Sequence, residues 1–253
     1  MTDKLLTGKR ALVTGASSGL GARFAEILAA DGAEVLLAAR RVDRLTSLVA
    51  SITAGGGKAS PLELDVIDPG SVSASVAVAF GDGGVDILVN NAGISIEKRI
   101  TDFTLDDYDR LMGTNQRGAW LVAQAVGQGM IARGQGGKIV NIASVLASSV
   151  LTGLSLYSMS KAAIVQMTRS MALEWARFDI QVNALAPGYI ETEINTGHFN
   201  SEAGKKQIDK LLRKRVGHPR DLDGALRLLV APDSNFITGS VITLDDGQTL
   251  KGF

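Results

Sequence analysis

Short apolar runs alternate along the chain with longer segments in which apolar residues recur at helical spacing. The short runs are rich in β-branched or apolar residues and are bounded by Gly, Asp or Asn, which is typical of strands. The pattern predicts seven strands, at residues 10–14, 34–39, 59–64, 85–89, 138–143, 180–184 and 240–244. Six segments between them are predicted as helices, at residues 20–30, 43–54, 71–80, 105–132, 157–177 and 220–230.

The predicted strands are apolar throughout, and helices separate them. This arrangement is typical of a parallel sheet that is covered on both faces. We therefore predict an α/β fold with a doubly wound, Rossmann-like parallel sheet of about seven strands and helices on both faces. No Pro- or Ser-rich linker interrupts the sequence, so we expect a single domain over residues 1–253. Ligands of such folds bind at the carboxyl ends of the strands.

Composition narrows the class of function. The 26 basic and 26 acidic residues leave no formal net charge, whereas nucleic-acid and membrane-surface proteins carry a basic excess. Small-molecule chemistry is favoured instead. The chain has no cysteine, which excludes disulfides and thiolate ligands, and we expect no metal site. The polar first ten residues and the lack of a long apolar run predict a cytoplasmic protein.

The turn after the first predicted strand, residues 14–21, reads TGASSGLG. Its glycines let the backbone turn tightly and approach a pyrophosphate, whose charge the N-terminus of the next helix stabilises. The spacing Gly-x-x-x-Gly-x-Gly differs from the usual dinucleotide fingerprint G-x-G-x-x-G. A phosphate-binding turn is the favoured interpretation, and an ordinary Gly-rich turn is the alternative.

The same turn also matches G-x-S-x-G, the nucleophile elbow of serine hydrolases, with Ser17 as the nucleophile. An elbow needs an oxyanion-hole NH from an earlier loop, an acid and a His, but only one short strand precedes Ser17. His198 and His218 both lie in polar segments without a matching acid motif. A serine hydrolase is therefore a remote alternative.

The end of the second predicted strand bears on the choice of cofactor. NAD-selective sites place an acid there, whereas this chain has Arg40 and Arg41 and no acid before the next helix. A guanidinium pairs with a 2′-phosphate, so NADP(H) is favoured and NAD(H) is the alternative. Two solvated charges at a helix start are the simpler interpretation. Asp65, after the third strand, either accepts from the adenine amine or caps a turn with Asp68.

Tyr157 and Lys161 are four residues apart in a predicted helix and share one face of it. An ammonium group at this distance lowers the pKa of a phenol, which turns tyrosine into a proton donor near neutral pH. Such pairs also occur by chance on amphipathic helices. The other motifs of the chain must decide between the two interpretations.

The chain resembles the short-chain dehydrogenase/reductase family over essentially its whole length. The resemblance rests on six motifs in the family's order and spacing: residues 14–21, the segment Asn90-Asn91-Ala92-Gly93, Asn115, Ser144, Tyr157 with Lys161, and Pro187-Gly188. Residues 182–192 are most similar to the 3-oxoacyl-carrier-protein reductase and glucose dehydrogenase branches.

The resemblance implies four catalytic residues. Tyr157 would be the general acid/base that protonates a ketone oxygen while the nicotinamide delivers hydride. Lys161 would lower the pKa of the phenol and hold the nicotinamide ribose, and Ser144 would hydrogen-bond the substrate oxygen. Asn115 would lie in a distorted helix and support a water chain to Lys161. Taken alone, Asn115 and Ser144 could equally be buried polar groups satisfied by the backbone.

The resemblance also assigns the cofactor contacts. Residues Gly15, Ser17, Ser18, Gly19, Leu20 and Gly21 match the phosphate loop, Asp65 and Val66 the adenine pocket, Asn91, Ala92 and Gly93 the ribose wall, and Pro187, Gly188, Ile190 and Thr192 the segment lining the nicotinamide. Some NADP-using relatives have a basic residue inside the glycine loop, where this chain has Ser17 and Ser18. The 2′-phosphate would therefore depend largely on Arg40, with Arg41 as a second partner.

Residues 191–215 follow the nicotinamide segment, are poorly patterned and are predicted as a substrate lid. Their cations suit an acidic carrier protein or a phosphorylated thioester, although interspersed Glu202 and Asp209 favour an ordinary solvated face. The expected reaction is hydride transfer between NADPH and a carbonyl or secondary alcohol, such as a 3-oxoacyl thioester or a small ketone. The alternative is a catalytically silent dinucleotide sensor or regulatory subunit. By resemblance, we expect a homotetramer.

Overall fold

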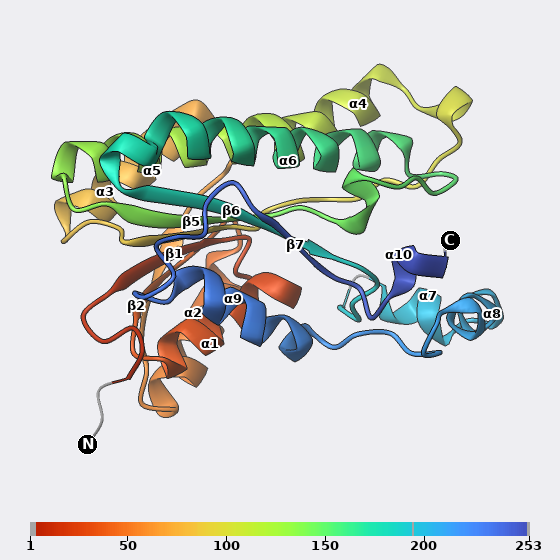
Figure 1. Cartoon of the computed structure of the whole chain (residues 1–253), viewed down its shortest axis with the longest axis horizontal. Helices are drawn as coiled ribbons and strands as arrows, with labels where there is room; N and C mark the ends of the chain where they lie inside the picture. The colour runs from red at the N-terminus through yellow and green to blue at the C-terminus, as the bar shows by residue number, and fades with distance from the viewer. Residues whose placement is uncertain (1–3, 194, 252–253) are drawn as a thin grey trace.

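Seven strands form one parallel sheet in the computed structural model, which describes residues 4–193 and 195–251 (Figure 1). They are β1 (Arg10–Thr14), β2 (Glu34–Ala39), β3 (Lys58–Glu63), β4 (Ile87–Asn90), β5 (Gly137–Ile142), β6 (Ile180–Pro187) and β7 (Val241–Leu244). Their spatial order is β3-β2-β1-β4-β5-β6-β7. The order reverses between β1 and β4, and sheets of this kind bind ligands beyond the carboxyl ends at such a switch point.

Helices cover both faces of the sheet (Figure 1). They are α1 (Gly19–Ala30), α2 (Val42–Ala54), α3 (Pro69–Gly81), α4 (Leu105–Met112), α5 (Ala119–Arg133), α6 (Ser155–Trp175), α7 (Thr196–Asn200), α8 (Glu202–Lys210), α9 (Asp223–Val230) and α10 (Gln248–Lys251). One layer contains α1, α2 and α9, and the other contains α3 to α6. The short helices α7, α8 and α10 gather beyond one end of the sheet.

The two larger apolar cores lie between the sheet and these layers. One joins the sheet to α1, α2 and α9 and includes the fully buried Phe24 and Leu28. The other joins it to α3, α5 and α6 and includes Leu12 and Met130. Full burial of one such side chain contributes about 1.5–3 kcal/mol. The doubly wound parallel sheet predicted from the sequence is therefore confirmed. Within the described part of the chain, no helix is long and apolar enough to cross a membrane.

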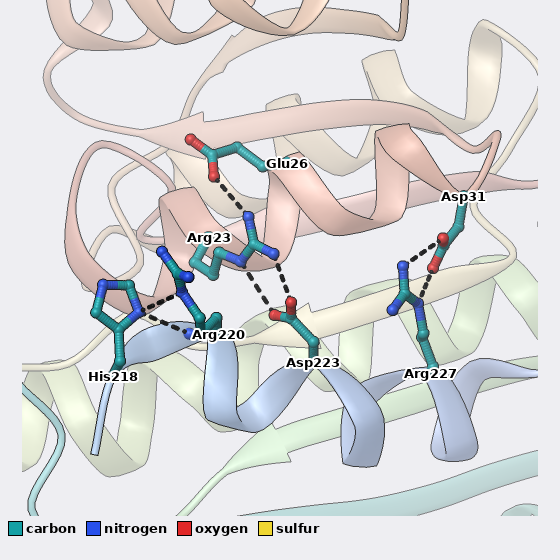
Figure 2. A network of polar contacts seen from close by, with 7 residues as sticks. All are labelled: Arg23, Glu26, Asp31, His218, Arg220, Asp223 and Arg227. Atoms are coloured by element: carbon teal, nitrogen blue, oxygen red, sulfur yellow. Dashed lines mark hydrogen bonds and ion pairs between the residues drawn. The ribbon is translucent and has the colours of Figure 1, made fainter. Parts of the chain in front are cut away.

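Two ion pairs join the ends of α1 and α9 (Figure 2), and a 3-10 helix, Pro219–Leu222, precedes α9. Arg23 of α1 donates to both carboxylate oxygens of Asp223, and one of these bonds measures 3.1 Å. Arg227 of α9 donates to Asp31 at 2.7 and 2.8 Å. These bidentate pairs fix the helix that begins at the glycine turn.

The predicted helix at 105–132 is helical throughout, but it is not regular. It is divided into α4, a π-helical segment Gly113–Gly118 and α5. A Cβ on Gly118 would lie 2.9 Å from Val66 Cγ2, and the side chain of Asn115 bonds to the backbone of Ile94. The distortion expected at Asn115 from the family resemblance is present. These tertiary contacts displace the backbone locally, which helical periodicity alone does not reveal.

Smaller differences concern the ends of elements. β6 runs to Pro187, three residues beyond the prediction, because it pairs with β7 up to Leu244. β4 begins at Ile87 rather than at residue 85. The predicted helix at 220–230 begins with a 3-10 turn before α9. Residues 191–215, left without an assigned element, contain α7 and α8, and Ile194 lies outside the described residues.

Candidate active site

Ser144 and Tyr157 meet beyond the carboxyl end of β5. Ser144 directly precedes the 3-10 helix Val145–Ala147, and its Oγ accepts from the Leu146 amide at 3.2 Å. Tyr157 lies in the first turn of α6, and its phenol is hydrogen-bonded to Ser144. Burial nevertheless raises the pKa of Tyr157 above its ordinary value of 10, and the bond to Ser144 opposes this only in part.

The direction of that shift corrects one expectation. Lys161 was expected to lower the pKa of the Tyr157 phenol, but loss of solvation is the largest influence and disfavours the phenolate. Lys161 lies 5.5 Å from the centre of the Tyr157 ring and is 5% exposed. Its Nζ donates to the Ile142 carbonyl at 2.7 Å. Burial lowers the pKa of Lys161 from 10.5 to about 8.

The side chain of Asn115 holds the segment after β4 against α6. Its Oδ1 accepts from the Ile94 amide at 2.8 Å, and its Nδ2 donates to the Ile94 carbonyl at 2.8 Å. The same Nδ2 donates to Ser160 Oγ at 3.1 Å, and Ser160 in turn donates to the Tyr157 carbonyl at 2.7 Å. The expected backbone distortion at Asn115 is present, and its amide is satisfied by protein groups. Sequence reasoning missed Ser160, although it lies within the Tyr157–Lys161 motif.

The glycine turn is closely packed against the segment after β4. Thr14 Oγ1 accepts from the amides of Asn91 and Ala92 at 2.9 and 3.0 Å. A Cβ on Gly15 would lie 2.9 Å from Ala92 Cα, and one on Gly21 would collide with the Gly15 carbonyl. Gly15 also has a positive φ of 67°. Only glycine fits these two positions, which leaves the backbone of the turn open to a ligand at the start of α1.

Arg41, rather than Arg40, contacts this turn. Its Nη2 donates to Ser17 Oγ at 2.9 Å and to Ser18 Oγ at 3.4 Å. Arg40 is exposed and makes no hydrogen bond or ion pair within the described residues. Arg41 is thus the arginine that contacts the glycine turn, and the pairing of either arginine with a 2′-phosphate stays a prediction.

The contacts of His218 do not support Ser17 as a nucleophile. His218 Nδ1 accepts from the backbone and side chain of Arg220 at 3.2 and 3.3 Å, and His218 caps a 3-10 helix (Figure 2). The side chain of His198 lies outside the described residues. Ser17 Oγ accepts from Arg41, and the hydrolase interpretation gains no support.

Asp65 makes the turn contact that was one of its two predicted roles. Its Oδ1 accepts from the Ile67 amide at 3.2 Å, and Asp68 caps α3 through the Gly70 amide at 2.9 Å. Val66 is buried against the π-helical segment. A contact of Asp65 with adenine stays a prediction.

The segment after β6 reaches back to the glycine turn. Gly188 donates from its amide to the Leu244 carbonyl at 3.0 Å, and Ile190 pairs with Gly217. The methyl carbon of Thr192 lies 3.6 Å from the position that a Cβ on Gly19 would occupy. Pro187 is the last residue of β6, and the segment that leads to Thr192 starts there. The nicotinamide-lining segment expected from the sequence and the phosphate loop are thus in contact.

The predicted lid at 191–215 is attached at both ends. Tyr189 accepts from Gln207 of α8 at 2.6 Å and packs edge-on against Phe199 of α7, with ring centres 5.6 Å apart. At the other end, Arg213 and Arg215 donate to the carboxylate of Asp246 at 2.9 and 2.8 Å. These contacts were not anticipated, because their partners are far apart in the sequence. The exposed Lys205 pairs with Glu202, as on an ordinary solvated face.

A cavity of about 410 Å³ lies between the lid and the C-terminal segment. Residues of 189–190, 211–222 and 242–248 line it. Ser144 and Tyr157 are not among its lining residues, so this cavity is separate from the place where the two side chains meet.

The fold and the glycine turn define a Rossmann-like α/β protein, and comparison with known proteins narrows this class. The family model described as Enoyl-(Acyl carrier protein) reductase matches residues 15–249. A gluconate 5-dehydrogenase of Gluconobacter oxydans (strain 621H) is 40% identical over 251 residues, which cover 97% of this chain and 96% of the relative.

Two solved structures are similar over nearly their whole length. A short-chain type dehydrogenase/reductase from Mycobacterium marinum has a TM-score of 0.92 at 39% identity, with 96% of each chain covered. A gluconate 5-dehydrogenase from Burkholderia cenocepacia J2315, solved in complex with NADP and tartrate, has a TM-score of 0.93 at 36% identity, with 98% of each chain covered. The chain belongs to the short-chain dehydrogenase/reductase family, as its motifs indicated.

Proposed function

We propose that this protein transfers hydride between NADP(H) and a carbonyl or secondary alcohol, with Tyr157 as the general acid and base. The observation that carries the proposal is the pairing of Tyr157 with Ser144 beside the buried ammonium of Lys161. A proton donor, a second hydrogen-bond donor and a cation at one point suit a reaction in which an oxygen gains negative charge.

The chain fits a dinucleotide at the switch point of the sheet. Gly15 and Gly21 have no room for a Cβ, and Gly93 is exposed beside Asn115 and Lys161. Arg41 supplies a guanidinium next to Ser17, and no acid lies at the end of β2 to repel a 2′-phosphate. The Burkholderia relative was solved with NADP, which supports NADP(H) rather than NAD(H) as the cofactor. When bound, the nicotinamide supplies or accepts the hydride.

The protein residues would manage the proton and the developing charge. In the direction of reduction, the Tyr157 hydroxyl donates its proton to the substrate oxygen, and Ser144 donates a hydrogen bond to the same oxygen. The raised pKa of Tyr157 keeps the phenol protonated at neutral pH, which suits an acid. Lys161 stabilises the phenolate left after proton transfer. Asn115 positions the segment at Ile94 through its amide.

Replacing Tyr157 by Phe tests this function. The variant keeps the ring and is expected to bind NADPH as the wild type does, while turnover of carbonyl substrates falls by about 10²–10⁴-fold. Tyr108→Phe is a matched control, since Tyr108 is an exposed tyrosine of α4 and should retain full activity. Unchanged turnover in Tyr157→Phe would contradict the proposal. If the protein is instead a silent sensor, the wild type itself would bind NADPH but reduce no carbonyl compound.

We further propose that the protein forms a homotetramer and acts in the cytoplasm on a small molecule, without nucleic acid or membrane. Exposed apolar side chains on α4, α5 and α6 support an assembly, among them Leu105 at 75%, Trp120 at 42% and Leu173 at 81% exposure. Light scattering after size-exclusion chromatography checks the assembly, and a monomeric mass would contradict it.

A further inference from the structure

Three loops surround the place where the substrate oxygen would lie. They follow the adjacent strands β4, β5 and β6, and the loop of the middle strand carries Ser144. Glu97 lies in the loop after β4, and Tyr189 lies in the loop after β6. Because parallel neighbouring strands end at the same edge, these two residues flank the reacting groups from opposite sides.

Glu97 is held against the loop that joins Ser144 to Tyr157. The amide of Lys98 donates to the Gly153 carbonyl at 3.0 Å. A Cβ on Gly153 would lie 3.1 Å from Glu97 Cγ, so the acidic side chain passes directly over this glycine. Gly153 itself lies two residues before the start of α6. The exposed Glu97 therefore lies against the loop that leads from Ser144 to Tyr157.

The negative charge of Glu97 also acts on Tyr189, in the loop after β6. It contributes to raising the pKa of the Tyr189 phenol, after the larger effect of burial. Gln207 of the lid donates to that phenol at 2.6 Å. The carboxylate, the phenol and the amide together make this side of the site polar and hydrogen-bonding.

The charges around Glu97 leave it without a nearby ion-pair partner. Lys98 is paired with Asp107 at 2.6 Å, and Arg213 and Arg215 are paired with Asp246. Arg99 is exposed and follows Glu97 by two residues, and neither it nor Glu97 forms an ion pair within the described residues. Lys161 is buried at the inner end of the site.

We propose that Glu97 makes this site selective for uncharged, polyhydroxylated substrates and disfavours those with a carboxylate or phosphate beside the reacting carbon. A carboxylate accepts hydrogen bonds from hydroxyl groups and repels other anions. The inference rests on the proposed function for the reaction and adds the class of substrate. It separates this chain from its relative named for gluconate, which is an acid anion.

The test compares two six-carbon probes, sorbitol and gluconate, that differ in having a carboxylate at one end. Each is titrated by calorimetry into the protein saturated with NADPH, which cannot accept hydride from either alcohol, so that no turnover occurs. Low ionic strength is used because salt screens charge. The wild type is expected to bind sorbitol more tightly. Glu97→Gln should reduce the preference by about tenfold, and Glu97→Arg should reverse it. Glu202→Gln, an exposed acid of α8 paired with Lys205, should leave it unchanged.

Three results would overturn the inference: tighter binding of gluconate by the wild type, an unchanged preference in Glu97→Gln, or binding of neither probe. The preference should also weaken as salt is added. Binding does not require turnover, so the titration is independent of the catalytic proposal. Retained activity in Tyr157→Phe would refute the role of Tyr157 while leaving the preference for sorbitol intact.

Discussion

The side-chain amide of Asn115 donates to the hydroxyl of Ser160 across 3.1 Å and thereby ties the π-helical segment to helix α6. Ser160 passes the connection to the Tyr157 carbonyl. The position of Tyr157 relative to Ile94, which follows the expected ribose wall, is thus determined by a short chain of hydrogen bonds.

Ser160→Ala should loosen this connection. The free energy of unfolding is expected to fall by about 1–3 kcal/mol, because one buried amide hydrogen loses its partner. kcat should fall, whereas KM for NADPH should change less, since Ser160 acts through Tyr157 and contacts no cofactor. Urea unfolding and steady-state kinetics measure both effects. Ser158→Ala is the control, because Ser158 Oγ is buried on the same helix without a hydrogen-bond partner among the described residues and its loss should be neutral.

Arg41→Ala should lower kcat/KM for NADPH by about 10–100-fold and leave kcat/KM for NADH nearly unchanged, because a charge-assisted bond to the 2′-phosphate is worth roughly 1.5–3 kcal/mol. Initial rates with both cofactors give the ratio. Arg40→Ala is the matched comparison and should have the smaller effect, since Arg40 does not contact the glycine turn. A larger loss in Arg40→Ala would support the order expected from the sequence instead.

Lys161→Met should stabilise the fold relative to the wild type at neutral pH, and this advantage should shrink as pH rises. In the folded chain the pKa of Lys161 is lowered from 10.5 to about 8, so between these values the unfolded chain binds more protons and the wild type gains stability with pH. Below about pH 8 the whole penalty, roughly 3 kcal/mol, is present in the wild type and absent from the variant. Chemical unfolding of both proteins from about pH 7 to pH 10 checks this, and parallel curves would contradict it.

Gly21→Ala should abolish tight NADPH binding, because the added Cβ would collide with the Gly15 carbonyl and lie 2.6 Å from Asn91 Nδ2. Fluorescence titration with NADPH measures the loss, and a thermal melt shows whether the fold survives. Gly81→Ala, at the end of α3, meets nothing within 4 Å and should be neutral or slightly stabilising. Equal NADPH affinity in Gly21→Ala and the wild type would show that the turn can relax.

Local chemistry accounts for what could be predicted. Short apolar runs and segments with helical spacing predicted every strand and the layered sheet, because a strand or helix buries its own apolar residues wherever the fold places them. The glycine turn and the Tyr157–Lys161 pair were also visible, since each lies within eight consecutive residues. The π-helical distortion at Asn115 was expected only from the family resemblance and not from helical periodicity, because Asn115 bonds to the backbone of Ile94, which is distant in sequence.

By itself, the sequence determined the parallel α/β architecture, the dinucleotide turn and the family of this protein, since these depend on short-range patterns and spacings. Only the tertiary structure decided that Arg41 lies over Ser17, that burial raises the pKa of Tyr157, and that Glu97 faces the loop at Gly153. These properties arise from contacts between loops of different strands. Desolvation and charge act through space, so the order of residues along the chain does not contain them until the sheet brings its carboxyl ends together.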